Sequence, residues 1–190
     1  DSPVITNEEL AQIRDADLPD FKTKTISMVY KVTEGAKGLE KVLEKAYKQA
    51  DEAITKGYSY LLLSDRKIDK DHAPIPILLA CSGVHHHLIR NGSRANVGII
   101  LESGEPREVH HFATLIGYGA GCINPYLAFE SLGNLINKGH TPKMPHEKAV
   151  KNFIKAVNKG MTKTMAKMGI SAVQSYRGAQ IFEAIGLNKE

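Results

Sequence analysis

The sequence ILLACSGVHHHLIRNGSRANVGIILESGEPREVHHFATLIGYGAGCINPYLAFESL, residues 77–132, decides the fold. It contains two helix-like runs, each with adjacent histidines, on either side of a short apolar strand at 97–101. That strand leads directly into a polar turn at 102–105. A buried strand followed by a polar turn and an amphipathic helix is the repeating unit of an α/β protein, and the rest of the chain divides into further copies of it.

Strand-like segments recur along the chain, separated by amphipathic helices. The β-rich or apolar runs lie at 25–30, 60–63, 97–101, 122–124 and 169–174. The spacing of apolar residues predicts helices at 38–56, 77–90, 108–118, 127–136 and 147–168, and a last one at 179–185. Connections that contain a helix imply parallel neighbouring strands. We therefore predict an α/β fold with a mainly parallel sheet of about five strands and flanking helices.

The length of the chain limits how far this pattern can extend. With 190 residues it fits a single α/β domain, 1–190, in which 1–24 is a polar lead-in. The segment 138–146 contains Gly139, Pro142 and Pro145 and is the best candidate for an internal linker. A closed (β/α)8 barrel needs eight units and roughly 250 residues. An open sheet, or an incomplete (β/α)8 barrel, is therefore expected.

The composition is that of an ordinary globular protein and excludes several classes of function. A net charge of +4, with acids mixed among the bases, and an aromatic content of 6% argue against a nucleic-acid partner. No apolar run reaches the roughly 18 residues of a membrane span, and the amino terminus has no signal-peptide pattern, so we expect a cytoplasmic fragment. Cys81 and Cys122 lack CxxC spacing, which favours buried thiols over a disulfide or zinc site.

Polar residues follow the predicted strands, at the end where parallel α/β proteins gather ligands. The candidates for such a polar face are Asp65, Glu102, Ser103, Glu105, Asn124 and Arg177, with Arg66, Ser175 and Tyr176 beside them. For each of them we favour an ordinary polar turn over a ligand contact, because a site has to be argued from geometry.

Two further patterns have a functional and a structural interpretation. Adjacent histidines at 85–87 and at 110–111 cannot share one helix face, and no pair has H-E-x-x-H spacing, so we favour helix packing or surface exposure over a metal site. The turn Ser175-Tyr176-Arg177-Gly178 would place free N–H groups and an arginine at the start of the last predicted helix. That arrangement suits a phosphate or carboxylate, but we favour the alternative that Gly178 only permits the turn and Arg177 pairs with a nearby acid.

Three long blocks of the sequence resemble the central region of the large subunit of glutamate synthase. They are ILLACSGVHHHLIR, ESGEPREVHHFATLIGYGAGCINPYLAFESL and KMGISAVQSYRGAQIFEAIGL, in the order of the family, and they extend the resemblance from about 61 to 187. The resemblance implies an α/β domain, similar to a rudimentary flavin barrel, between a glutaminase domain and an FMN-binding (β/α)8 barrel of the same polypeptide. In that family, glutamine supplies ammonia, 2-oxoglutarate is converted to glutamate, and an iron–sulfur cluster passes electrons to FMN.

The chain departs from the complete family pattern at both ends. It begins at Asp1 without the catalytic cysteine, its two cysteines cannot supply the cluster ligands, and it stops near Leu187, where the flavin barrel would start. We therefore assign it no catalytic, cofactor-binding or metal-ligating residue, and expect a structural and channelling domain that is inactive alone. The competing hypothesis is an independent small enzyme that binds a phosphate ligand at the Arg177-Gly178 turn. A third is a pure interaction module with exposed apolar patches.

Overall fold

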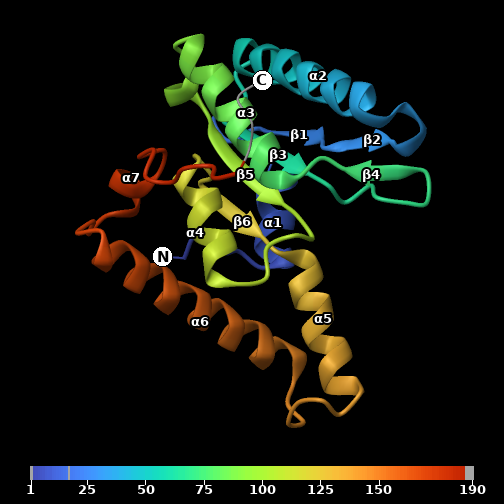
Figure 1. Cartoon of the computed structure of the whole chain (residues 1–190), viewed down its shortest axis with the longest axis vertical. Coiled ribbons are helices and arrows are strands. Elements are labelled where there is room, and N and C mark those ends of the chain that lie inside the picture. The colour runs from blue at the N-terminus through green and yellow to red at the C-terminus, as the bar shows by residue number, and fades with distance from the viewer. Residues whose placement is uncertain (1, 17, 187–190) are drawn as a thin grey trace.

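A parallel four-stranded sheet is the centre of the structure, a computed structural model that describes residues 2–16 and 18–186 (Figure 1). The strands are β1 (Thr23–Ser27), β3 (Tyr60–Ser64), β5 (Gly98–Glu102) and β6 (Cys122–Asn124), in the spatial order β1-β3-β5-β6. Their order in the sheet is their order in the chain, as in a (β/α)8 barrel, whereas a doubly wound sheet reverses its direction. The predicted parallel α/β fold with flanking helices is confirmed.

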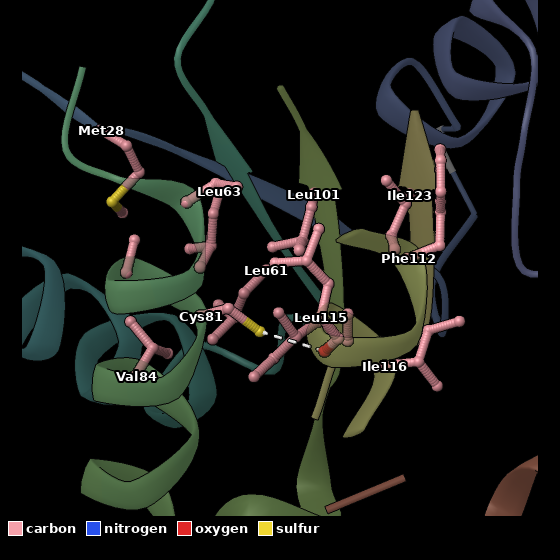
Figure 2. Packing of buried hydrophobic residues seen from close by; sticks show 14 of the residues in the cluster. Met28, Leu61, Leu63, Cys81, Val84, Leu101, Phe112, Leu115, Ile116 and Ile123 are labelled. Carbon is pink, nitrogen blue, oxygen red and sulfur yellow. Dashed lines mark hydrogen bonds between the residues drawn. The ribbon is translucent and has the colours of Figure 1, made fainter. Parts of the chain in front are cut away.

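One face of the sheet is covered by three helices: α2 (Gly35–Thr55), α3 (Ile77–Arg90) and α4 (Val109–Gly117). Leu61, Leu63 and Leu101 point to this face and are fully buried against Cys81 and Leu115 (Figure 2). The Sγ atom of Cys81 lies 3.9 Å from the carbonyl oxygen of Leu115, so this thiol is a packing group between α3 and α4. Each such leucine contributes about 1.5–3 kcal/mol of burial free energy.

The opposite face of the sheet carries a smaller apolar cluster under helix α1 (Asn7–Arg14). Because side chains alternate along a strand, Leu62 and Ile100 point away from the three outer helices and pack on Leu10. The helix begins with a capping box, in which the Thr6 side chain and the Glu9 carboxylate each accept a backbone N–H. The strands are therefore buried on both faces, as their unbroken apolar runs predict.

The amino-terminal segment extends the sheet beyond β6. The N–H of Ile123 donates to the oxygen of Pro3 (2.8 Å), and the N–H of Ile5 donates to the oxygen of Ile123 (3.0 Å). Val4 is buried there in a parallel bridge with Ile123. Much of the segment 1–24, which we expected to be a polar lead-in, thus packs into the fold, and β1 already begins at Thr23.

The first predicted strand, 25–30, is two strands in the structure. β1 ends at Ser27, and β2 (Val29–Lys31) turns away to pair antiparallel with β4 (His72–Pro74). Met28 lies at the break and is fully buried; its N–H donates to the oxygen of Ser64 and its carbonyl accepts from Ile75. A short 3-10 turn at Val32–Glu34 leads from β2 to α2, and another at Arg94–Asn96 leads from α3 to β5.

The carboxyl-terminal third contains α5 (Tyr126–Asn137), α6 (His146–Lys167) and the one-turn α7 (Val173–Tyr176). The fifth strand predicted at 169–174 and the helix predicted at 179–185 are both wrong. If the sheet continued in barrel order, a strand after α6 would pair with β6, and residues 3–5 already occupy that edge. The segment instead packs through Tyr176, which is fully buried and whose hydroxyl donates a hydrogen bond to the carbonyl oxygen of Ala113. It also packs through Phe182, whose ring contacts the ring of Tyr176 edge-on.

The two long carboxyl-terminal helices are joined by a short connection. Residues 138–145 connect α5 to α6, and α6 packs against α4 and α5. No helix within the described part of the chain is long and apolar enough to cross a membrane.

Candidate functional site

Five of the six predicted polar residues lie together at the carboxyl ends of β3, β5 and β6, here called the polar edge. They are Asp65, Glu102, Ser103, Glu105 and Asn124. Register explains the grouping, because Ser64, Glu102 and Asn124 are direct partners across the three strands. Burial is unusual for such side chains: Asp65, Ser103 and Asn124 have no exposed surface and Glu102 retains 5%. Buried polar groups need internal partners, and these residues have them except at the side-chain oxygen of Asn124.

Asp65 is the centre of the polar edge. Its carboxylate accepts hydrogen bonds from the Ser103 hydroxyl (2.6 Å), the Tyr126 hydroxyl (2.7 Å) and the Gly104 N–H (3.1 Å). The three donors come from the turn after β5 and from the start of α5, so one carboxylate joins three segments. Burial, followed by the bond to Asp65, raises the pKa of Tyr126, which keeps its hydroxyl protonated as a donor.

Glu102 points to the opposite face and binds α1. Its carboxylate lies 2.8 Å from the Arg14 guanidinium and accepts a hydrogen bond from the Ser64 hydroxyl. Arg66 approaches the same carboxylate at 3.9 Å while its guanidinium lies 4.1 Å from the centre of the Tyr126 ring. These contacts fix the end of α1 to the sheet, because a buried carboxylate is stabilised only where a cation and hydrogen bonds compensate for lost water.

Glu105 and Asn124 attach the polar edge to its surroundings. Both carboxylate oxygens of Glu105 lie 3.2 Å from the N–H of Ile77, the first residue of α3. Burial raises the pKa of Glu105, partly offset by this bond. The Asn124 amide donates to the oxygen of Ile5 (3.2 Å) and to the Asn7 side chain (2.9 Å). Its own oxygen, also buried, has no partner among the described residues.

Arg177, the sixth candidate, lies elsewhere. It lines a cavity at the amino ends of the strands with Gly98, Gly121 and Cys122, the opposite end of the sheet from Asp65. The prediction that all six residues share one face is therefore wrong for Arg177. The helix expected to begin after Gly178 is also absent from the described residues 179–186, so the Arg177-Gly178 turn lacks the helix N-terminus that the phosphate hypothesis requires.

The histidines of α3 serve packing between elements. His85 is buried, and its Nδ1 atom accepts a hydrogen bond from Arg94 Nε at 2.9 Å; burial lowers the pKa of His85 to about 4, so its ring is neutral. Arg94 also donates to the oxygens of Val97 (2.6 Å) and Gly119 (2.8 Å). His87 contacts Asp51 of α2 at 2.8 Å. Within residues 2–16 and 18–186, no three His, Cys, Asp or Glu side chains come together as metal ligands.

Three residues that matter here were not singled out from the sequence: Tyr126, Arg14 and Arg94. Tyr126 and Arg14 act across long sequence separations, for example 61 residues between Tyr126 and Asp65. Only Tyr126 had a local signal, because it directly follows the Pro125 that ends a strand. The polar edge as a whole joins loops and helices through buried hydrogen bonds, and its carboxylates are occupied in doing so.

Sheet order and polar edge together define an incomplete (β/α)8 barrel whose strand-end polar groups bind one another. Solved structures agree with this class. The chain is similar to the recombinant flavin-binding domain of baker's yeast flavocytochrome b2, with a TM-score of 0.53 and 14% identity over 95% of this chain and 41% of that one. It is also similar to DHODH from Eimeria tenella in complex with ferulenol, with a TM-score of 0.52 and 15% identity over 74% and 36% of the two chains. At such identities the likeness concerns the fold alone.

The chain belongs to the glutamate synthase central domain family, whose model matches residues 1–188. It is 47% identical to the NADPH glutamate synthase large chain of Bacillus subtilis, over 100% of this chain and 12% of that protein. It is 42% identical to the NADH glutamate synthase of Schizosaccharomyces pombe, over 100% and 9%. The chloroplastic ferredoxin-dependent glutamate synthase of Spinacia oleracea is also 42% identical, over 100% and 12%. The chain thus spans about a tenth of the length of the curated relatives it matches.

Proposed function

We propose that this chain is the structural and channelling domain of a glutamate synthase. In this proposal it joins the glutaminase domain to the FMN-binding synthase domain of the same polypeptide, and helps to keep the ammonia path between them closed to solvent. The reaction, from glutamine and 2-oxoglutarate to glutamate, takes place in those neighbouring domains. FMN and the iron–sulfur cluster are bound there as well, and this chain supplies no ligand to either.

The observation that carries the proposal is that the side chains of the polar edge bond to one another and to neighbouring loops and helices. In parallel α/β enzymes the strand ends present reactive groups to a ligand. Here the Asp65 carboxylate accepts three internal donors, and Glu102 is held by Arg14 and Ser64. Carboxylates that bond to loops and helices in this way hold those segments rigidly together. A rigid spacer is what two catalytic domains need if a small intermediate is to pass between them.

The test uses a full-length glutamate synthase that contains this chain. Asp65→Ala removes the acceptor that joins three segments and should loosen the polar edge. We expect glutamine-dependent glutamate formation to fall by more than ammonia-dependent formation, with ammonia released into solution. The control is Leu88→Ala, which removes a fully buried side chain of α3 and lowers stability by about 2–5 kcal/mol without touching the polar edge. Equal losses of both activities in both variants would overturn the channelling role.

A second test uses the 190-residue chain alone. Incubated with FMN, glutamine and 2-oxoglutarate, it should form no glutamate and retain no stoichiometric flavin after gel filtration. Tight flavin binding at one per chain would contradict the proposal directly.

A further inference from the structure

The cavity that contains Arg177 lies at the end of the sheet that the proposed function does not use. It has a volume of about 450 Å³ and is bounded by α1, the segment that follows α1, and the first residues of β3, β5 and β6. This volume is within the range of small-molecule sites, about 300–1,000 Å³. The polar edge is at the other end of the same strands, so the cavity is a separate feature of the molecule.

The walls of the cavity are mainly apolar and aromatic. Phe21 and Tyr60 lie with their ring centres 6.4 Å apart and their planes 22° from parallel. A Cβ atom on Gly98 would lie 2.8 Å from the Tyr60 ring, so the glycine at the start of β5 allows this ring to lie across the strand. Ile13 of α1 and Ile100 of β5 complete the apolar surface. Such walls suit an apolar ring or a branched chain.

One cation faces this apolar space. The Arg177 Nη1 atom lies 4.0 Å from the position of a Cβ on Gly121, the residue before β6. Its charge lowers the pKa of the neighbouring Cys122 thiol, although burial is the larger effect and raises that pKa. Within residues 2–16 and 18–186, no carboxylate forms an ion pair with Arg177. A guanidinium above an apolar cavity attracts a carboxylate, which it can bind through two N–H groups.

We propose that this cavity binds a small organic carboxylate with an apolar body, with Arg177 paired to the carboxylate and the body between Tyr60, Phe21 and Ile13. The inference does not depend on the proposed channelling role, because it concerns the opposite end of the sheet. Phenylacetate is a suitable probe, since it combines one carboxylate with one ring. 2-Phenylacetamide keeps the ring without the charge, and acetate keeps the charge without the ring.

Calorimetric titration of the 190-residue chain separates these contributions. Phenylacetate should bind, while 2-phenylacetamide and acetate should each bind at least about tenfold more weakly, since one charge-assisted pair or one buried ring changes affinity by that order. Arg177→Gln should weaken phenylacetate binding about tenfold and Arg177→Lys by less. The matched control, Arg90→Gln, changes an exposed arginine at the end of α3 and should leave affinity unchanged. No measurable phenylacetate binding, or equal binding by Arg177→Gln, would overturn the proposal.

Cys122 provides an independent readout that does not depend on affinity changes in a variant. It lines the cavity and is partly accessible, whereas Cys81 is fully buried. An aromatic disulfide reagent at pH 8.5, which exchanges with thiols only, should therefore react once per folded chain, and Cys122→Ser should abolish the reaction. Phenylacetate should slow the modification of Cys122, and acetate should not. Modification at an unchanged rate under saturating phenylacetate would place the ligand elsewhere and refute the assignment.

Discussion

Removing the hydroxyl of Tyr126 tests whether the buried Asp65 carboxylate organises the carboxyl edge of the sheet. In Tyr126→Phe the carboxylate loses its 2.7 Å donor but keeps Ser103 and Gly104. A hydrogen bond to a charged group contributes about 1.5–3 kcal/mol. The ring itself remains, so its contact with Arg66 persists. We expect a loss of about 2 kcal/mol in the free energy of unfolding, and a fall in Tm of roughly 4–8 °C for a domain of this size.

Urea denaturation and calorimetry of the 190-residue chain measure this loss against a matched control. Tyr118→Phe removes a hydroxyl whose bond to the oxygen of Phe182 is 3.3 Å long and involves no charge, so the cost should stay below about 1 kcal/mol. The two variants should also differ above pH 10. Because the folded pKa of Tyr126 is raised, wild type loses stability as pH rises beyond the unfolded value, and Tyr126→Phe should lose less over that window. Equal midpoints for the two variants would refute a central role for Asp65.

Three further outcomes concern His85, Gly119 and Glu105. Because the pKa of His85 is lowered to about 4, the neutral ring stabilises the fold above pH 6.5, and this stabilisation is lost as pH falls towards 4. His85→Gln should therefore flatten the pH dependence of the urea midpoint in that window. Gly119 has φ +109° and a Cβ there would collide with the His85 ring, so Gly119→Ala should cost more than about 3 kcal/mol, against about 1 kcal/mol for Gly92→Ala in open space at φ +68°. Burial raises the pKa of Glu105, so Glu105→Gln should be at least as stable as wild type at pH 7, with the difference shrinking towards pH 4, as urea titrations at both values will show.

The parallel sheet could be predicted from the sequence because its strands have clear local sequence patterns. Leu61, Leu62 and Leu63 form an unbroken apolar run, which favours a strand buried on both faces, and the structure buries all three completely. The break at Met28 had no local signal, since the residues on both sides favour β structure. It depends on a backbone bond from Met28 to Ser64, 36 residues away, and on the pairing of β2 with β4.

The strand wrongly predicted at 169–174 shows that a local preference for β structure does not by itself produce a strand. Ile170 and Val173 favour β structure, but a strand forms only if an edge is available to pair with. The N–H of Ile170 bonds instead to Met165 in the last turn of α6, with Gly169 at φ +69° ending that helix. Competition for the β6 edge involves residues 3–5, and no window of the sequence contains both competitors.

The candidate site was predictable in part for the same reason. The carboxyl ends of parallel strands lie at the same end of the sheet, so residues that follow Leu63, Leu101 and Ile123 were expected to gather there. Asp65, Ser103 and Asn124 lie together at that end. The pattern of strands in the sequence does not show whether those groups face a ligand or each other. That distinction depends on donors such as Tyr126 and Arg14, which the fold brings from distant parts of the chain.

The amino-terminal segment covers the outer edge of β6 and part of the interior of this incomplete barrel. A sheet with unpaired N–H and C=O groups at its edge is a template for aggregation. Here residues 3–5 pair with Ile123 at the position that the next barrel strand would occupy. The chain then enters α1, whose Leu10 covers the inward-facing Leu62 and Ile100. Residues 3–5 therefore cover the outer edge of β6 and α1 covers part of the inward face, and within the described residues a cavity remains at the amino ends of the strands.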